Sequence, residues 1–176
     1  MPRLFFALWP NSEVRAQLAA RRDPVVRAYA GRSMRADTLH MTMLFLGETP
    51  ELLVPDLLAC GDRVRASSFT LNVDACCHFP HSKVAWLGCT EPPAQLNTLW
   101  SALREQVDPL MPAAFADSVP NEFHPHITVA RDCLHFPAPH GVPPVTWPVE
   151  DFVLIDSNVL PGGPLYRVLR HWQLQA

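Results

Sequence analysis

The stretch HPHITVAR (124–131) places a histidine and a threonine two positions apart in an apolar setting. The stretch LHMTMLFLGE (39–48) has the same pattern in the first third of the chain. Short apolar runs of this kind predict buried β-strands. We therefore expect two strands, one in each half of the chain, that each carry a histidine–threonine pair.

Side chains alternate between the two faces of a β-strand, and this fixes how each pair is presented. His40 and Thr42 share one face of the first strand, and His126 and Thr128 share one face of the second. The apolar residues between and after them, Phe45 included, are expected on the opposite, buried faces. If the two halves of the chain are related by a pseudo-twofold axis, the two polar pairs face each other across a cleft.

The rest of the chain alternates between strand-like and helix-like patterns of apolar residues, separated by turn residues. Asp23-Pro24 is expected to end the first helix, because proline lacks the amide hydrogen that a helix interior needs. We expect strands at 4–8, 38–46, 69–74, 83–88, 125–131, 149–155 and 165–174, and helices from Asn11 or Ser12 to about Arg22, from Thr49-Pro50 to about Ala66, and over 92–107.

Strands outnumber helices in this order, and several strands follow one another directly. Such an order predicts an α+β fold with largely antiparallel sheet and argues against a doubly wound parallel sheet. Each histidine–threonine strand follows a helix, as expected of a diverged internal duplication. Because a chain of 176 residues suits one domain, we expect residues 1–176 to form a single domain with two pseudo-symmetric lobes.

The composition is that of a globular protein, with 48% apolar and 18% charged residues. The formal net charge of −3 gives no bulk attraction to nucleic acid, so RNA binding would require a local basic patch. Proline is abundant, with 19 residues, and it clusters in PAPHGVPPVTWP (137–148). We expect that stretch to be a stiff loop.

The five cysteines have irregular spacing and form no CxxC motif. An odd count of this kind is typical of reduced thiols in a cytosolic protein. The apolar run in MPRLFFALWP (1–10) is too short for a signal-peptide core or a membrane span, so we interpret it as a buried strand. We therefore expect a cytoplasmic protein that does not associate with a membrane.

Two facing imidazoles form an acid–base pair, because an unperturbed histidine titrates near ~6.5. The neutral ring can take a proton from water, and the charged ring can give a proton to a leaving oxygen. The threonine hydroxyls are suited to bond the non-bridging oxygens of a phosphate. This arrangement fits in-line cleavage of a phosphodiester without a metal or other cofactor, although the pseudo-symmetry leaves open which histidine is the acid.

These motifs resemble those of the 2H phosphoesterase family, and in particular its LigT/ThpR branch of RNA 2′,3′-cyclic phosphodiesterases. The resemblance covers nearly the whole chain, and the order and spacing of its segments are more specific than two histidine–threonine pairs. The similar segments are RLFFALWP (3–10), LHMTMLFLGE (39–48), FPHSKVAWLG (79–88), FHPHITVAR (123–131) and FVLIDSNVLPGGPLYRVLRHWQL (152–174).

The resemblance implies a bilobal fold, with two antiparallel sheets around a central cleft and helices packed outside. It implies hydrolysis of a 2′,3′-cyclic phosphate end to a 2′-phosphate, with reversible 2′,5′ RNA ligation as a further activity. By the family pattern, His40 is the proton donor to the 3′ oxygen and His126 is the proton acceptor. Thr42 and Thr128 would hold the phosphate. Arg131 would add positive charge, although strict alternation places it on the buried face, so a bend is required.

Other functions fit the same residues. One alternative is an enzyme whose cleft accepts another phosphodiester, such as a 2′,5′-linked oligonucleotide or a small cyclic nucleotide. Another is a protein that binds RNA ends without cleaving them. Two intact histidine–threonine pairs favour an enzyme over a binding protein. A metal site built from CCHFPHS (76–82) with His124 and His126 lacks normal zinc spacing, so we expect no metal.

The expected partner is an RNA or oligonucleotide with a 2′,3′-cyclic phosphate end, or a cyclic nucleotide, bound by a monomer. Phosphate contacts dominate RNA affinity, so a cationic strip should flank the cleft. Trp86, Phe45 and Tyr166 are candidates for stacking on a base, with core packing the better expectation for Phe45. The candidate cations are Arg32, Arg35, Lys83, Arg131, Arg167 and Arg170.

Overall fold

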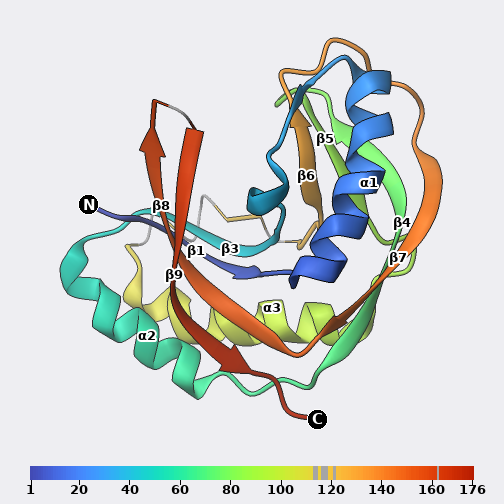
Figure 1. Cartoon of the computed structure of the whole chain (residues 1–176). Coiled ribbons are helices and arrows are strands. Elements are labelled where there is room, and N and C mark those ends of the chain that lie inside the picture. Colours follow the sequence, from blue (N-terminus) through green and yellow to red (C-terminus); the bar gives the residue numbers. More distant parts are fainter. Residues whose placement is uncertain (113–114, 116–118, 121, 162) are drawn as a thin grey trace.

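The computed structural model describes residues 1–176 except 113–114, 116–118, 121 and 162 (Figure 1). The elements are β1 (Arg3–Leu8), α1 (Ser12–Tyr29), β2 (Arg32–Ser33), η1 (Ala36–Thr38), β3 (Met41–Glu48), η2 (Glu51–Leu53), α2 (Val54–Arg63), β4 (Phe69–Phe79), β5 (Val84–Gly88), α3 (Ala94–Val107), η3 (Asp108–Leu110), β6 (Ile127–Arg131), β7 (His140–Val149), β8 (Asp151–Leu160) and β9 (Gly163–Gln173), where η marks a short 3₁₀ helix.

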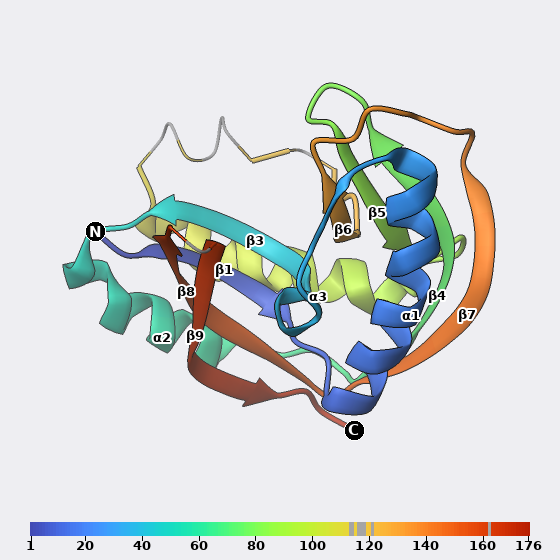
Figure 2. The same cartoon turned by 45° about the horizontal axis from the view of Figure 1, so that its top comes forward.

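The strands form two antiparallel sheets, which confirms the predicted α+β class. The first sheet has the order β3-β1-β8-β9, and the second has the order β2-β6-β5-β4-β7. The two histidine–threonine strands, β3 and β6, lie in different sheets, and Figure 2 shows the sheets as two lobes. The predicted bilobal arrangement is therefore correct.

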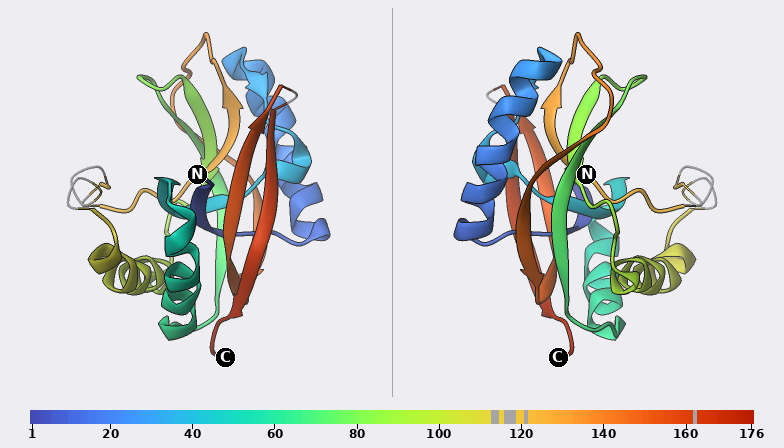
Figure 3. Two further views of the ribbon diagram at one scale, coloured as in Figure 1. Left: turned by 90° about the vertical axis from the view of Figure 1, so that its left-hand side faces the viewer. Right: turned by 90° about the vertical axis from the view of Figure 1, so that its right-hand side faces the viewer.

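Two helices cross between the lobes. Helix α1 follows β1 of the first sheet and leads through the short β2 of the second sheet to β3, and it packs against β6 and β7 of the second sheet. Helix α3 connects β5 to β6 of the second sheet and packs against β3 of the first, beside α2. Figure 3 shows α2 and α3 together on one side of the molecule and α1 on the other. Each of these two helices therefore packs on the sheet opposite to the strand that precedes it.

The opening strand shows how the sequence builds the site. Leu4, Phe6 and Leu8 are fully buried in the main core, which contains residues from both sheets and all three α-helices. Phe5 and Ala7 point to the other face, into a smaller apolar cluster. The strict alternation of β1 thus separates a core face from a face that borders the cleft.

The first helix does not end before Asp23-Pro24. Helix α1 continues without a break through Pro24 to Tyr29. Val25 and Tyr29 continue the buried stripe that Val14 and Leu18 begin, and all four belong to the main core. Burial of these side chains outweighs the amide hydrogen bond that proline removes.

The proline-rich segment 137–148 is largely a strand and not a loop. Strand β7 runs antiparallel to β4 at the edge of the second sheet. Prolines are tolerated on an edge strand because one side of that strand has no neighbour, so a missing amide hydrogen there costs no sheet hydrogen bond. Val145, Trp147 and Val149 alternate into the core, and this burial holds the segment in place.

Several other boundaries differ from the prediction. Strand β4 runs on to Phe79 instead of ending at Asp74, because its second half pairs with β5. Strand β8 extends to Leu160 through its long hairpin with β9. Thr49 does not cap a helix: its hydroxyl donates to the Gly47 carbonyl, and a 3₁₀ turn precedes α2. Strand β2, of two residues, was not predicted.

Candidate active site

A β-bulge in β3 turns Phe45 toward the cleft. Strand β1 pairs Ala7 with Thr42 and Phe6 with Leu44, which leaves Met43 unmatched. Because one residue is extra, Met43 and Leu44 are both buried and the alternation changes phase. Phe45 consequently shares the face of Thr42 and is 46% exposed. The expectation that Phe45 packs in the core is wrong.

Strand β6 contains a bulge at the matching place. Strand β5 pairs consecutive residues with Thr128 and Ala130, so Val129 is unmatched. Val129 and Ala130 are both buried, and Arg131 emerges on the face of Thr128. This bulge supplies the bend that Arg131 requires. The same irregularity at the same place in both strands also favours the internal duplication suggested by the sequence.

The faces of Thr42 and Thr128 border one cavity of about 330 Å³ between the two sheets. All five predicted site residues lie around it, together with residues from β1, β2, β8 and β9. The cavity is lined by Arg3, Phe5, Arg32, Met34, Thr38, His40, Thr42, Phe45, His126, Thr128, Arg131, Ser157, Pro164 and Tyr166.

His40 immediately precedes β3 and is held by hydrogen bonds at both ring nitrogens. Its Nδ1 lies 2.7 Å from the Thr38 carbonyl oxygen, and its Nε2 lies 3.0 Å from Thr42 Oγ1. A carbonyl can only accept, so Nδ1 carries the hydrogen and donates it. In the neutral ring the lone pair is therefore on Nε2, where the Thr42 hydroxyl can donate to it.

His126 precedes β6 and has the same backbone tether. Its Nδ1 donates to the His124 carbonyl oxygen at 2.7 Å, which again leaves the lone pair of the neutral ring on Nε2. The Phe79 ring lies edge-on to it, with centroids 5.0 Å apart. Both imidazoles thus use a carbonyl two residues upstream to select the tautomer. A hydrogen bond from one ring nitrogen to a carbonyl fixes the orientation of the ring and the position of its proton.

Both histidines have pKa values below the ordinary value. Burial lowers the pKa of His40 to about 4, opposed by the hydrogen bond to Thr38 and reinforced by the positive charges of His126, Arg131 and Arg15. Burial also lowers the pKa of His126, with help from Arg131. Desolvation disfavours the charged imidazolium in each case. At neutral pH both rings are therefore neutral in the free protein.

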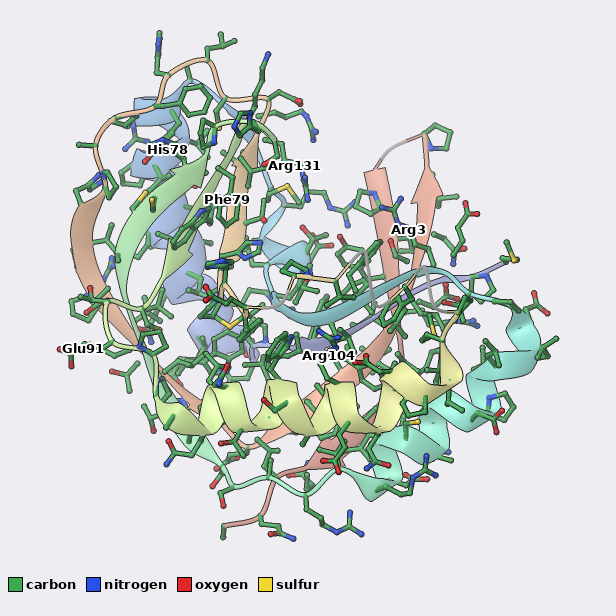
Figure 4. All side chains as sticks on the ribbon, turned by 180° about the vertical axis from the view of Figure 1, so that it is seen from behind. Arg3, His78, Phe79, Glu91, Arg104 and Arg131 are labelled. Carbon is green, nitrogen blue, oxygen red and sulfur yellow. The ribbon has the colours of Figure 1, made fainter. Side chains whose placement is uncertain are left out.

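Three arginines line the cavity, and only two of them were predicted. Arg131 and Arg32 extend from adjacent strands of the second sheet, and Arg3 extends from the first. Figure 4 shows Arg131 beside the second sheet and Arg3 beside the first. Alternation along β1 places Arg3 on the face of Phe5, and this signal was available in the sequence. Its guanidinium lies 5.0 Å from the centroid of the Phe45 ring.

The other candidate cations lie elsewhere or are engaged. Lys83 is not among the residues that line the cavity. The three remaining arginines are also outside the lining, and carboxylates bind them in the pairs Arg35–Asp37, Arg167–Asp156 and Arg170–Asp62. Arg32 of the cavity is likewise paired, with Asp132 at 2.9 Å.

Of the aromatic candidates, Tyr166 and Phe45 line the cavity. Trp86 instead packs against His126 from the neighbouring strand, with ring centroids 6.1 Å apart. Ser157 also lines the cavity, as the partner of Tyr166 in the β8–β9 hairpin. A paired register places both side chains on one face. The predicted strand at 149–155 ends before Ser157, so this residue was not predicted from the sequence.

Two further geometric findings bear on the expected absences. Among the described residues, no three His, Cys, Asp or Glu side chains converge as metal ligands, and this includes the described part of the chain around 76–82. No described helix has the length and apolar character needed to cross a bilayer.

Comparison with known proteins agrees with this geometry. The family model described as the 2′-5′ RNA ligase superfamily matches residues 10–159. The chain is 35% identical over 176 residues to the RNA 2′,3′-cyclic phosphodiesterase of Escherichia coli (strain K12), covering 98% of this chain and 96% of that protein. It is 36% identical over 184 residues to the protein of the same name from Thermus thermophilus, covering 98% and 90%.

Solved structures give the same result. The crystal structure of E. coli LigT complexed with 3′-AMP superimposes with a TM-score of 0.83 at 33% identity, and the match covers 99% of each chain. The crystal structure of E. coli LigT complexed with phosphate has the same TM-score and identity. With a family model that matches most of the chain and relatives above 30% identity over nearly its full length, this protein belongs to the 2′-5′ RNA ligase superfamily of 2H phosphoesterases.

Proposed function

We propose that this protein hydrolyses 2′,3′-cyclic phosphate ends of RNA to 2′-phosphates by metal-free acid–base catalysis with two histidines. The protein is a phosphodiesterase of the 2H class, as are its named relatives. One observation carries the mechanism: two imidazoles from different sheets, each fixed through Nδ1 to a backbone carbonyl, border one cavity. This geometry leaves the two Nε2 atoms as the proton-transfer sites.

The proposed reaction is an in-line displacement at phosphorus. His126 Nε2 takes a proton from water as the water oxygen bonds to phosphorus. His40 Nε2 gives a proton to the 3′ oxygen as the bond between that oxygen and phosphorus breaks. The product is a 2′-phosphate with a free 3′-hydroxyl, and the two rings exchange protonation states. The hydroxyls of Thr42 and Thr128 stabilise the non-bridging oxygens, where negative charge increases.

The low pKa of His40 is compatible with its role as the acid. A bound phosphate brings negative charge next to the ring and favours the imidazolium, which opposes the effect of burial. Once protonated, an imidazole with a low intrinsic pKa is a stronger acid toward the leaving oxygen. Arg131, Arg32 and Arg3 would attract the anionic substrate into the cavity and hold the phosphate there.

Histidine substitution with product analysis tests the proposal. Wild type, His40→Ala and His126→Ala are incubated with a 2′,3′-cyclic nucleotide in EDTA, and the 2′- and 3′-phosphate products are resolved. We expect only 2′-phosphate from wild type and a loss of about 10²–10⁴-fold in each variant. His135→Ala, at an exposed position outside the cavity, is the matched control. A 3′-phosphate product, or activity that requires added zinc, would refute the mechanism.

A second hollow suits dinucleoside diesters as further substrates, and the description of the family, the 2′-5′ RNA ligase superfamily, points to the 2′,5′ linkage. An apolar cavity of about 570 Å³ adjoins the first and shares Thr42, Phe45 and His126 with it. Trp100 and Phe123 stack in its wall, with ring centroids 5.6 Å apart. A diester carries a nucleoside on each side of phosphorus, so two hollows at one catalytic centre suit it. Incubation with 2′,5′- and 3′,5′-linked dinucleotides should give cleavage of the 2′,5′ isomer alone.

We also propose that the protein acts as a monomer in the cytoplasm. The active-site cavity is lined by residues of one chain from both sheets, so catalysis needs no second copy. All five cysteines are free thiols, in keeping with a reducing compartment. Light scattering that reports a dimer at catalytic concentrations would contradict the first part of this proposal.

A further inference from the structure

The two catalytic imidazoles differ in what lies against their rings. Phe5 and Trp9 both stack nearly parallel to the His40 ring, at interplanar angles of 29° and 26° and centroid distances of 5.0 and 5.7 Å. Tyr166 meets the same ring edge-on at 5.4 Å. Among the described residues, no aromatic ring stacks parallel to His126. The pseudo-symmetry of the backbone is therefore broken around His40.

Trp9 itself carries a cation. The guanidinium carbon of Arg15, in the first turns of α1, lies 5.0 Å from the centroid of the Trp9 ring. Arg15 Nη2 donates to the Pro10 carbonyl oxygen at 3.1 Å, while its buried Nε has no partner among the described residues. A partly buried guanidinium on an indole is a fixed positive charge, because arginine does not lose its proton in proteins.

Local register brings these groups together. Strand β1 pairs Leu8 with Met41, so the next residues along the two chains, Trp9 and His40, lie across from each other. Trp9 and Arg15 do not line the cavity, whereas Phe5 and Tyr166 do. Trp9 and Arg15 are therefore placed to act on His40 and not on the substrate.

We propose that Trp9 and Arg15 are positioning residues for His40, a proposal that rests on the function proposed above. Trp9 fixes the plane of the imidazole, and the positive charge of Arg15 behind it adds to the effect of burial, which disfavours the imidazolium until substrate binds. The substrate phosphate then supplies the negative charge that allows His40 to take up its proton. Among the described residues, His126 has no stacked ring and arginine behind it, so the two histidines have different surroundings and different proposed roles.

Several charged groups lie near the His40 ring, and Arg15 is one of them. Arg15 contributes to the lowered pKa of His40, after burial and the charges of His126 and Arg131. Asp37 acts on Arg15 and is itself bound to Arg35. The titratable and charged groups around the stacked rings of Phe5, Trp9 and His40 come from several elements. They are Arg15 on α1, Arg35 just before η1, Asp37 on η1, His126 just before β6, Arg131 on β6, and Tyr166 on β9.

The first test measures His40 without substrate. Proton NMR follows the titration of the His40 ring in wild type, Arg15→Met, Arg15→Lys and Arg27→Met, with His40→Asn to assign the signal. Arg27 is exposed on the same helix, so Arg27→Met removes an equal charge at a distance. We expect Arg15→Met to shift the midpoint upward by roughly 0.5–1 pH unit, and Arg15→Lys and Arg27→Met to leave it nearly unchanged.

The second test measures catalysis. The acidic limb of the kcat/KM profile with a 2′,3′-cyclic nucleotide should move upward in Arg15→Met and stay in Arg15→Lys. Trp9→Leu should lower kcat at least tenfold with little change in KM, and Trp9→Phe should restore most of it. Equal shifts of the acidic limb in Arg15→Met and Arg27→Met would overturn the proposal. A higher KM with unchanged kcat in Trp9→Leu would also overturn it.

The two proposals fail separately. If wild type does not turn over the cyclic nucleotide, the proposed function fails, yet the NMR titration still decides whether Arg15 controls His40. If wild type is active and the midpoint is the same in all variants, only the positioning role is overturned. Far-UV circular dichroism of each variant establishes that it is folded before either measurement is interpreted.

Discussion

At the scale of single residues, the proposed catalytic pair depends on backbone carbonyls as much as on the imidazoles. His40 and His126 each donate from Nδ1 to a carbonyl two residues upstream, at 2.7 Å in both cases. The chain supplies these acceptors because it is not yet in the strand at residues 38 and 124, where the carbonyls are free of sheet pairing. A histidine within the strand would have neighbours already used by the sheet.

The lowered histidine pKa values predict an acidic optimum for kcat/KM. Catalysis needs one neutral and one protonated ring, and burial disfavours the protonated form in the free enzyme. The singly protonated form is therefore most populated below pH 6.5, and it declines again as pH falls toward the pKa of His40 at about 4. Rates measured from pH 3.5 to 9 should rise and fall within the acidic half. A maximum above pH 7 would contradict this.

At the scale of elements, the two bulges determine which residues enter the cleft. Without the extra residue in β3, Phe45 would point into the core, and without the one in β6, Arg131 would. Simple alternation predicts His40 and Thr42 correctly because they precede the bulge, but it fails for Phe45, which follows it. A bulge depends on the pairing with the neighbouring strand, and the sequence of β3 alone does not contain that information.

The other differences from prediction have the same origin. Alternation and the histidine–threonine repeat were sufficient to predict an α+β fold and to predict that His40, Thr42, His126 and Thr128 face one cavity. Pro24 and the prolines of β7 were interpreted as breaks, because their local effect opposes regular structure. Burial of Val25 and Trp147 against distant segments reverses that outcome. Such tertiary contacts cannot be read from a window of neighbouring residues.

The exposed position of Phe45 predicts a binding role without a stability role. Phe45→Ala should raise KM for a 2′,3′-cyclic nucleotide about tenfold, since loss of base stacking is worth roughly 1–3 kcal/mol. The unfolding midpoint should change little, because the ring is 46% exposed. Steady-state kinetics and thermal unfolding check both parts, with Leu52→Ala, 77% exposed outside the cleft, as control. A strongly lowered melting temperature with normal KM would show that Phe45 serves packing.

At the scale of the whole molecule, the crossed helices join the lobes. Helix α1 follows a strand of the first sheet but packs on the second, and α3 joins two strands of the second sheet but packs on β3 of the first. The main core accordingly contains Leu4 and Phe6 of the first sheet and Leu87 and Val129 of the second. The distance between the imidazoles of His40 and His126 is thus set by packing within one core. A hinge between two independent halves would not preserve that distance.

This shared core predicts that residues 1–176 unfold as one domain. Phe6 is fully buried against Phe152 and Trp172 of the first sheet. Phe6→Ala should lower the free energy of unfolding by about 3–5 kcal/mol. In a cooperative domain, the slowest-exchanging amides of β5 and β6, in the other sheet, lose protection by the same free energy. Amide hydrogen exchange measures both sheets at once, with Leu52→Ala as the control. Loss of protection confined to β1, β3, β8 and β9 would show instead that the lobes unfold separately.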